Sequence, residues 1–205
     1  RDHTERMLRG FGASVTSEAS NEGLAITLTG QPELRATPVM VPGDPSSAAF
    51  LAVAGTIVPG SALTITNVMQ NEHRTGLFQS LVDMGADLAL VNPREVAGET
   101  VADVQVQSSS LKGCLIPADR APSQIDEYPI LSVAAAVASG TTRMEGLEEL
   151  RVKESDRLAG IIDMLGAAGV VTRSGEDWLE IDGLGGPVPG GGLVETQLDH
   201  PRAMS

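Results

Sequence analysis

The sequence predicts an α/β (α+β) fold built from repeated units of about 80 residues. The first observation is an internal repeat: residues 45–60 and 125–140 share apolar positions at an offset of about 80, as with Leu51 and Leu131. Each copy reads as an apolar helix that ends at a glycine, and a short strand pattern follows it. A period this long favours repeated α/β units over a solenoid of short repeats.

A second type of helix recurs along the chain and is the other observation. Each copy ends at a glycine, the residue that most easily adopts the left-handed conformation at a helix C-terminus. β-rich segments follow each copy, so each unit is predicted to run helix, strand, strand, helix, strand. These helices are predicted at residues 4–12, 74–85 and 158–169, with strands at 14–16, 25–28, 63–68, 87–91, 101–107, 141–146, 170–173 and 178–181.

The composition predicts a globular protein with an aliphatic core. The chain has 205 residues, enough for one large domain or parts of two, with 41% apolar and only 2% aromatic residues. Its longest apolar stretches, residues 48–58 and 130–138, are shorter than the roughly 20 residues that cross a bilayer. Cys114, the only cysteine, excludes an internal disulfide and fits a reducing, cytoplasmic location. We expect it to be a small buried hydrophobe in a strand.

The charged heptad at residues 151–157 is the strongest functional signal. The net charge of −13 argues against nucleic acid and anionic membranes, so anionic substrates would need cations focused in one cleft. Lys153 and Arg157 are four positions apart, which on one helix makes a like-charge pair that costs roughly 0.2–0.5 kcal/mol. With Ser155 as N-cap, both would flank a helix N-terminus that favours an anion. Glu154, between them, is a candidate proton donor or acceptor. The alternative is a solvated, salt-bridged helix start.

Two matching helix starts carry further candidates. Asp44 is a predicted N-cap and Pro45 suits the first helical position. Asp126 occupies the corresponding place in the second repeat, with Pro129 starting the helix. Asp126 is either another cap or a carboxylate that orients or deprotonates a hydroxyl at the mouth of a cleft. The sequence has no P-loop, HExxH, CxxC or GxSxG motif.

Five motifs occur along the chain in this order: residues 1–7 (RDHTERM), 42–47 (PGDPSS), 125–129 (IDEYP), 151–157 (RVKESDR) and 198–200 (LDH). Together they resemble the 5-enolpyruvylshikimate-3-phosphate (EPSP) synthase family, and most of all the bacterial class that includes glyphosate-tolerant members. The resemblance covers essentially the whole chain and implies two lobes, each of three βαβαββ units, incomplete here at both ends. Residues 1–60 would end the phosphoshikimate-binding lobe, and residues 61–205 would form about two of the three units of the second lobe, with a boundary near residues 58–61.

The resemblance also implies a reaction and site residues. The family transfers the enolpyruvyl group of phosphoenolpyruvate to the 5-hydroxyl of shikimate 3-phosphate and releases phosphate, through a tetrahedral intermediate and without a metal or cofactor. Arg1 matches the arginine at the shikimate phosphate, Asp126 the carboxylate at the 5-hydroxyl, and Lys153 the lysine at the shikimate substrate. Glu154 matches the acid that protonates the enol methylene, and Arg157 matches an arginine that binds phosphoenolpyruvate. A full-length protein of this kind is expected to be a monomer.

One motif departs from the family pattern, and other hypotheses remain open. The family reads Asp-His-Arg where this chain has Asp199, His200 and Pro201, so that the arginine is displaced to Arg202. A chain that begins without methionine is expected to be a piece of a longer protein. Such a piece would be catalytically inactive alone, which is the competing hypothesis. A UDP-N-acetylglucosamine enolpyruvyl transferase is the alternative within the fold, and the charge disfavours an RNA 3′-phosphate cyclase.

Overall fold

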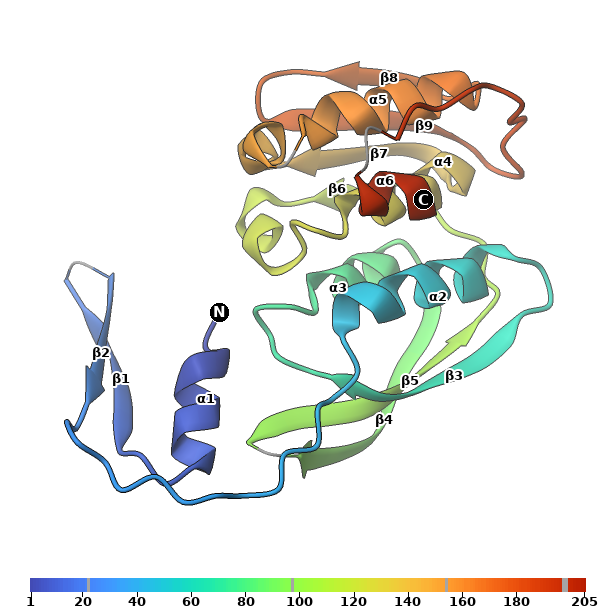
Figure 1. Cartoon of the computed structure of the whole chain (residues 1–205). Helices are drawn as coiled ribbons and strands as arrows, with labels where there is room; N and C mark the ends of the chain where they lie inside the picture. The colour runs from blue at the N-terminus through green and yellow to red at the C-terminus, as the bar shows by residue number, and fades with distance from the viewer. Residues whose placement is uncertain (22, 97, 154, 197–198) are drawn as a thin grey trace.

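The computed structural model describes residues 1–21, 23–96, 98–153, 155–196 and 199–205 (Figure 1). Within these ranges no helix combines the length and apolar character that a membrane span requires. The elements, in chain order, are α1 His3–Gly10, β1 Val15–Ser20, β2 Gly23–Leu28, α2 Pro45–Ile57, β3 Ala62–Met69, α3 Gly76–Asp83, β4 Asp87–Val96, β5 Glu99–Gln107, β6 Leu115–Ile116, the 3₁₀ helix η1 Ala118–Ser123, α4 Tyr128–Val137, β7 Ser139–Glu145, the 3₁₀ helix η2 Glu148–Val152, α5 Arg157–Ala167, β8 Val171–Ser174, β9 Trp178–Leu184 and α6 His200–Met204.

The described strands form three separate sheets. A hairpin pairs β1 with β2, a second sheet has the order β3-β5-β4, and a third has the order β6-β7-β9-β8. All neighbouring strands are antiparallel except β6 and β7, which are parallel. The second and third sheets each combine one strand after an apolar helix with a hairpin after the next helix. The predicted α/β class and the repeated unit are therefore confirmed.

Helices α2 and α4 lie between the second and third sheets (Figure 1). Their contact is made by small side chains, because Ala49, Ala52, Ala134 and Ala135 are fully buried in one continuous core. Such small residues let two helices and two sheets approach closely with few aromatic groups, as the composition predicted. Two aromatic side chains are nevertheless buried in this core: Phe78 in α3 and Tyr128 at the first position of α4.

The glycines predicted to end three helices have the expected conformation. Gly12, Gly85 and Gly169 have φ of 91°, 94° and 84°, the left-handed region that disfavours residues with a side chain. Each lies two residues beyond the last helical residue, so the helices are shorter than residues 4–12, 74–85 and 158–169. The predicted αL termini are confirmed, and the error is confined to the helix boundaries.

The packing of α2 bears on the predicted lobe boundary near residues 58–61. The residues of α2 belong to the same core as β3 and β5, and Gly43 already pairs with Val68 of β3. By contrast, Ala13 and Val15, near β1, are buried outside that core. The division into residues 1–60 and 61–205 stays a prediction, while the core described here begins with α2.

Cys114 lies directly before β6 rather than within a strand. It is half-buried and packs against the apolar core. Burial, reinforced by the nearby charge of Asp83, raises the pKa of the thiol, which disfavours the reactive thiolate. The side chain therefore acts as a small hydrophobe.

Candidate active site

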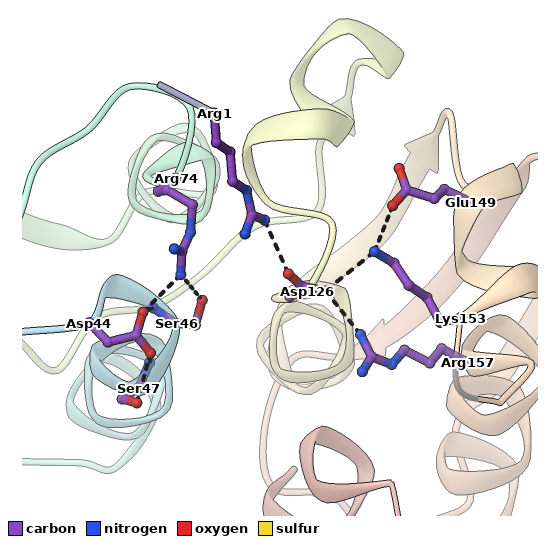
Figure 2. A network of polar contacts seen from close by, with 9 residues as sticks. All are labelled: Arg1, Asp44, Ser46, Ser47, Arg74, Asp126, Glu149, Lys153 and Arg157. Atoms are coloured by element: carbon purple, nitrogen blue, oxygen red, sulfur yellow. Dashed lines mark hydrogen bonds and ion pairs between the residues drawn. The ribbon is translucent and has the colours of Figure 1, made fainter. Parts of the chain in front are cut away.

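Asp126 is the centre of the candidate site, because three cations from separate parts of the chain converge on its carboxylate (Figure 2). Arg1 donates to Oδ2 at 3.1 Å, and Arg157 donates to Oδ1 at 3.0 Å. The Lys153 ammonium lies 3.6 Å from Oδ1. The structure thus brings together Arg1, Asp126, Lys153 and Arg157, the described residues that the family resemblance assigns to the site.

Each of these side chains is positioned by the end of a helical element. Arg1 precedes α1, Asp126 lies in the turn before α4, Lys153 follows η2, and Arg157 is the first residue of α5. Lys153 is therefore not on the same helix as Arg157, and the predicted like-charge stacking on one helix face is wrong. The two cations meet through the shared carboxylate of Asp126 instead, which offsets their repulsion.

The N-cap of α5 is Asp156, and the predicted cap at Ser155 is wrong. The Asp156 carboxylate accepts a hydrogen bond from the backbone N–H of Ala159 at 2.9 Å. An Asp cap is as effective as a Ser cap, and it adds a negative charge at the positive end of the helix. Ser155 is thereby free to donate its hydroxyl to Asp199, at 2.9 Å.

Arg157 is the most firmly held cation of the site. Its side chain is 5% exposed, and its Nε donates to Asp199 at 3.1 Å, while its Nη1 contacts Asp126. Asp199 is itself only 3% exposed on its side chain. Two carboxylates on two sides fix the guanidinium plane, which suits planar recognition of an anion.

Among the described residues, the acids of the site form ion pairs with its cations. Besides Asp126 and Asp199, Glu149 forms an ion pair with Lys153 at 2.6 Å. An anionic ligand would therefore take over cations that already have partners, rather than bind to isolated charges. Arg1 also lines an open pocket, so a ligand has access to its guanidinium; the other lining residues are Glu72, His73, Asp119, Pro122 and Ser123.

The pKa of Asp126 reflects two opposing effects. Partial burial raises it, but the hydrogen bond from Arg1 and the charges of Lys153, Arg1 and Arg157 hold it below the ordinary value of an aspartate. The carboxylate is thus ionised at neutral pH. Its predicted alternative role as a helix cap is not seen, because Glu127 holds the N-cap position of α4 without a side-chain cap bond.

A second polar cluster adjoins the site at the start of α2 (Figure 2). Asp44 caps α2 as predicted, accepting from the backbone N–H of Ser47 at 2.9 Å, with Pro45 as the first helical residue. Arg74 donates to Asp44 and to Ser46, both at 2.8 Å. The sequence analysis did not name Arg74 as a candidate, because Arg74 lies outside the five motifs.

Glu127 was also missed, although it is next to Asp126 in the sequence. It is 3% exposed, and its Oε1 has no hydrogen-bond partner among the described residues. Burial raises the pKa of this carboxyl, against the opposing hydrogen bond with Ser46. Its position directly beside a candidate catalytic acid was the signal available in the sequence.

Two predicted features fall partly or wholly outside the described residues. Glu154, the candidate proton donor, is outside them. Asp199 has the N-cap position of α6, His200 is its first residue and Pro201 follows, whereas the Arg202 side chain is not described. No group of three or more His, Cys, Asp or Glu side chains in the described ranges is arranged to hold a metal ion.

Comparisons with known proteins match this chain over its full length. The family model for EPSP synthase (3-phosphoshikimate 1-carboxyvinyltransferase) matches residues 1–205. Two curated proteins named 3-phosphoshikimate 1-carboxyvinyltransferase, from Methylobacterium sp. (strain 4-46) and Granulibacter bethesdensis, are 59% and 57% identical to this chain. Both alignments cover 100% of this chain and 46% of the relative. The chain therefore spans about half the length of the curated relatives it matches.

Solved structures give the same result. The EPSP synthase of Acinetobacter baumannii superimposes with a TM-score of 0.95 at 43% identity, covering 100% of this chain and 46% of that one. The enolpyruvyl transferase NikO from Streptomyces tendae, at 20% identity and a TM-score of 0.60, shares the fold. A match to the family model over every residue, together with this superposition, establishes that the chain belongs to the EPSP synthase (3-phosphoshikimate 1-carboxyvinyltransferase) family.

Proposed function

We propose that this chain supplies part of the active site of an enzyme that transfers the enolpyruvyl group of phosphoenolpyruvate to the 5-hydroxyl of shikimate 3-phosphate. The observation that carries the proposal is the convergence of Arg1, Lys153 and Arg157 on the carboxylate of Asp126. Both substrates are phosphorylated anions, so clustered cations are needed to bind them beside a carboxylate that acts on a hydroxyl. The reaction belongs to the shikimate pathway, which leads to chorismate and the aromatic amino acids.

The proposed roles divide between the two substrates. Arg1 and Lys153 bind shikimate 3-phosphate, and Arg157 binds phosphoenolpyruvate. Asp126 accepts the proton of the 5-hydroxyl as its oxygen bonds to C2 of phosphoenolpyruvate, while Glu154 protonates the C3 methylene. The tetrahedral adduct then returns a proton from C3 to Glu154 and expels phosphate, which re-forms the C2=C3 double bond and gives the enol ether product. This mechanism requires no metal or cofactor.

Substrate binding would raise the pKa of Asp126, the proposed base. The hydrogen bond from Arg1 and the charges of Lys153, Arg1 and Arg157 depress the pKa of Asp126, which makes it a weak base. When the phosphate and carboxylate groups of the substrates take over these cations, their hold on Asp126 decreases and its pKa rises. The carboxylate would thus become a stronger base only when both anions are in place.

The context of this activity follows from the family. We propose a cytoplasmic protein that acts as a monomer at full length, with shikimate 3-phosphate and phosphoenolpyruvate as its partners and neither nucleic acid nor a membrane. Because the chain spans 46% of its relatives, residues contributed by the remaining sequence are needed for turnover. The second candidate follows from the same observation: the 205 residues alone are an inactive piece that at most binds a phosphorylated ligand.

The test uses a chimera in which this chain replaces the corresponding segment of the Methylobacterium relative. We expect phosphate release that depends on both substrates, and we expect Lys153→Ala to reduce kcat/KM by at least about 100-fold, because a charged contact to an anion is lost. Lys112→Ala, an exposed lysine outside the site, is the matched control and should remain active. A fully active Lys153→Ala chimera with normal folding would contradict the proposed site.

A further inference from the structure

A polar cluster, here named the α1 anchor, joins the first helix to the neighbouring sheet. It consists of Asp2, His3, Arg6, Asn71 and Glu99. The amide of Asn71 donates to Asp2 at 2.7 Å, and Arg6 donates from Nε to the other Asp2 oxygen at 2.8 Å. One carboxylate oxygen of Glu99 lies 2.7 Å from His3 Nδ1, and the other lies 3.4 Å from Arg6 Nη1. The anchor therefore links residues almost 100 positions apart in the sequence.

The two anchor residues on the sheet side, Asn71 and Glu99, are buried and held by backbone contacts. Asn71 is 1% exposed, and its Oδ1 accepts the backbone N–H of His73 at 3.0 Å, which fixes the turn after β3. Glu99 is 8% exposed and starts β5, paired with Val96 across the β4–β5 hairpin. Gly98, in this hairpin, has a φ of 82°, and an added Cβ would lie 3.2 Å from the Arg6 carbonyl oxygen. The hairpin tip and α1 are thus in close contact.

The attachment of α1 is mainly polar. Glu5 is its only buried residue, so the helix contributes no fully buried apolar side chain to the core. Charge-assisted hydrogen bonds are directional, and they fix orientation more strictly than apolar packing does. Partial burial raises the pKa of Asp2, but hydrogen bonds from Asn71 and Arg6 lower it to about 2, so Asp2 stays ionised across the physiological range.

Arg1 immediately precedes this anchor and reaches Asp126 at 3.1 Å. Its side chain is 37% exposed, and Arg1 lies outside α1. Asp2, the residue that follows it, is bonded to Asn71 on one carboxylate oxygen and to Arg6 on the other, which fixes the Arg1 backbone on that side. A shift of α1 away from the β4–β5 hairpin would move Arg1 away from Asp126.

We propose that the α1 anchor is a positioning device: Asn71 and Glu99, through Asp2, His3 and Arg6, hold the Arg1 guanidinium against Asp126. The identity of the ligand that Arg1 meets, the phosphate of shikimate 3-phosphate, rests on the proposed function, whereas the positioning of Arg1 does not. None of the anchor residues touches the reacting groups. Their role is to set where one substrate-binding cation lies.

The test measures the pKa of Asp126 by ¹³C NMR of its carboxyl carbon in the 205-residue chain. Arg1→Ala gives the rise that results from complete loss of the Arg1 contact. Glu99→Gln should produce at least about half of that rise, because the contacts of His3 and Arg6 with residue 99 lose the carboxylate charge. The direction is diagnostic: removal of a negative charge by itself lowers the pKa of a nearby carboxyl, whereas release of Arg1 raises it.

Two further variants make the result decisive. Glu95→Gln removes the same charge from the exposed face of the same hairpin and should not raise the pKa of Asp126. Asn71→Ala breaks the anchor at its other attachment and should raise it, which keeps the test valid if Glu99→Gln does not fold by circular dichroism. An unchanged or lowered pKa of Asp126 in folded Glu99→Gln and Asn71→Ala would overturn the proposal.

The same samples separate this proposal from the proposed function. Addition of shikimate 3-phosphate should shift the Arg1 Nε–H signal in the unmodified chain and shift it less in Asn71→Ala. If the pKa of Asp126 responds to the anchor variants but no Arg1 signal responds to the ligand, the anchor is supported and the ligand assignment fails. If the pKa does not respond, the anchor proposal fails whatever the ligand does.

Discussion

Asp199→Ala is predicted to destabilise the chain by about 3 kcal/mol, because it leaves a buried cation without one of the two carboxylates that it contacts among the described residues. Asp199 is 3% and Arg157 5% exposed on their side chains, so water cannot replace the lost partner. Removing one member of a buried ion pair costs about 3–5 kcal/mol. Arg157 keeps its 3.0 Å contact with Asp126, and the lower end of that range is therefore expected.

Urea denaturation of the 205-residue chain, followed by circular dichroism, gives the free energy of unfolding for this comparison. Asp182→Ala is the matched control, since Asp182 likewise pairs with an arginine, Arg173, from which it accepts two hydrogen bonds, but on the exposed face of the third sheet. Asp182→Ala should lower the free energy of unfolding much less than Asp199→Ala does, because exposed ion pairs are screened by water. A loss in Asp199→Ala no larger than that in Asp182→Ala would refute the reasoning.

Two further predictions concern the polar cluster at the starts of α2 and α4. Burial raises the folded-state pKa of Glu127 above its unfolded value, so stability from this group is present below the unfolded pKa and is lost as pH rises through the folded pKa. The Tm of Glu127→Gln minus the Tm of the unmodified chain should therefore increase as the pH rises from about 4 to about 8. A difference in Tm that does not change with pH would contradict this. Asp44→Ala removes the α2 cap and should cost about 1 kcal/mol in thermal unfolding, whereas Asp87→Ala, an exposed acid at a strand start, should cost little.

Local chemistry made much of the fold predictable. The repeat, the glycines beyond three helices and the Asp44–Pro45 start of α2 all depend on backbone preferences within a few residues. The boundaries were less certain, because a helix end is decided by the last hydrogen bonds rather than by the glycine that follows. Arg74, for example, lies before α3 and bonds to the start of α2, although the apolar pattern placed it inside a helix.

The structure brings the candidate site residues together, but their arrangement was not predictable from the sequence. The motifs named Asp126, Lys153 and Arg157 as candidates, and their roles stay a prediction. Helical spacing suggested that Lys153 and Arg157 stack on one helix, whereas Lys153 follows η2, Arg157 begins α5, and the two meet at Asp126. The partner of Ser155 is Asp199, 44 positions away, and no local pattern contains that information.

The convergence on Asp126 also has a consequence for how the chain folds. Its contacts with Arg1 and Arg157 join positions 125 and 31 residues apart, so the cluster closes two loops of very different length. Closing the longer loop costs more chain entropy and depends on structure that forms around it first. Helices α4 and α5 with their sheet can bring Arg157 and Lys153 to Asp126 early, whereas Arg1 arrives only when α1 has docked. We therefore expect the cluster around Asp126 to be completed late in folding, and we expect partly folded chains in which α1 has not docked to lack Arg1 at this cluster.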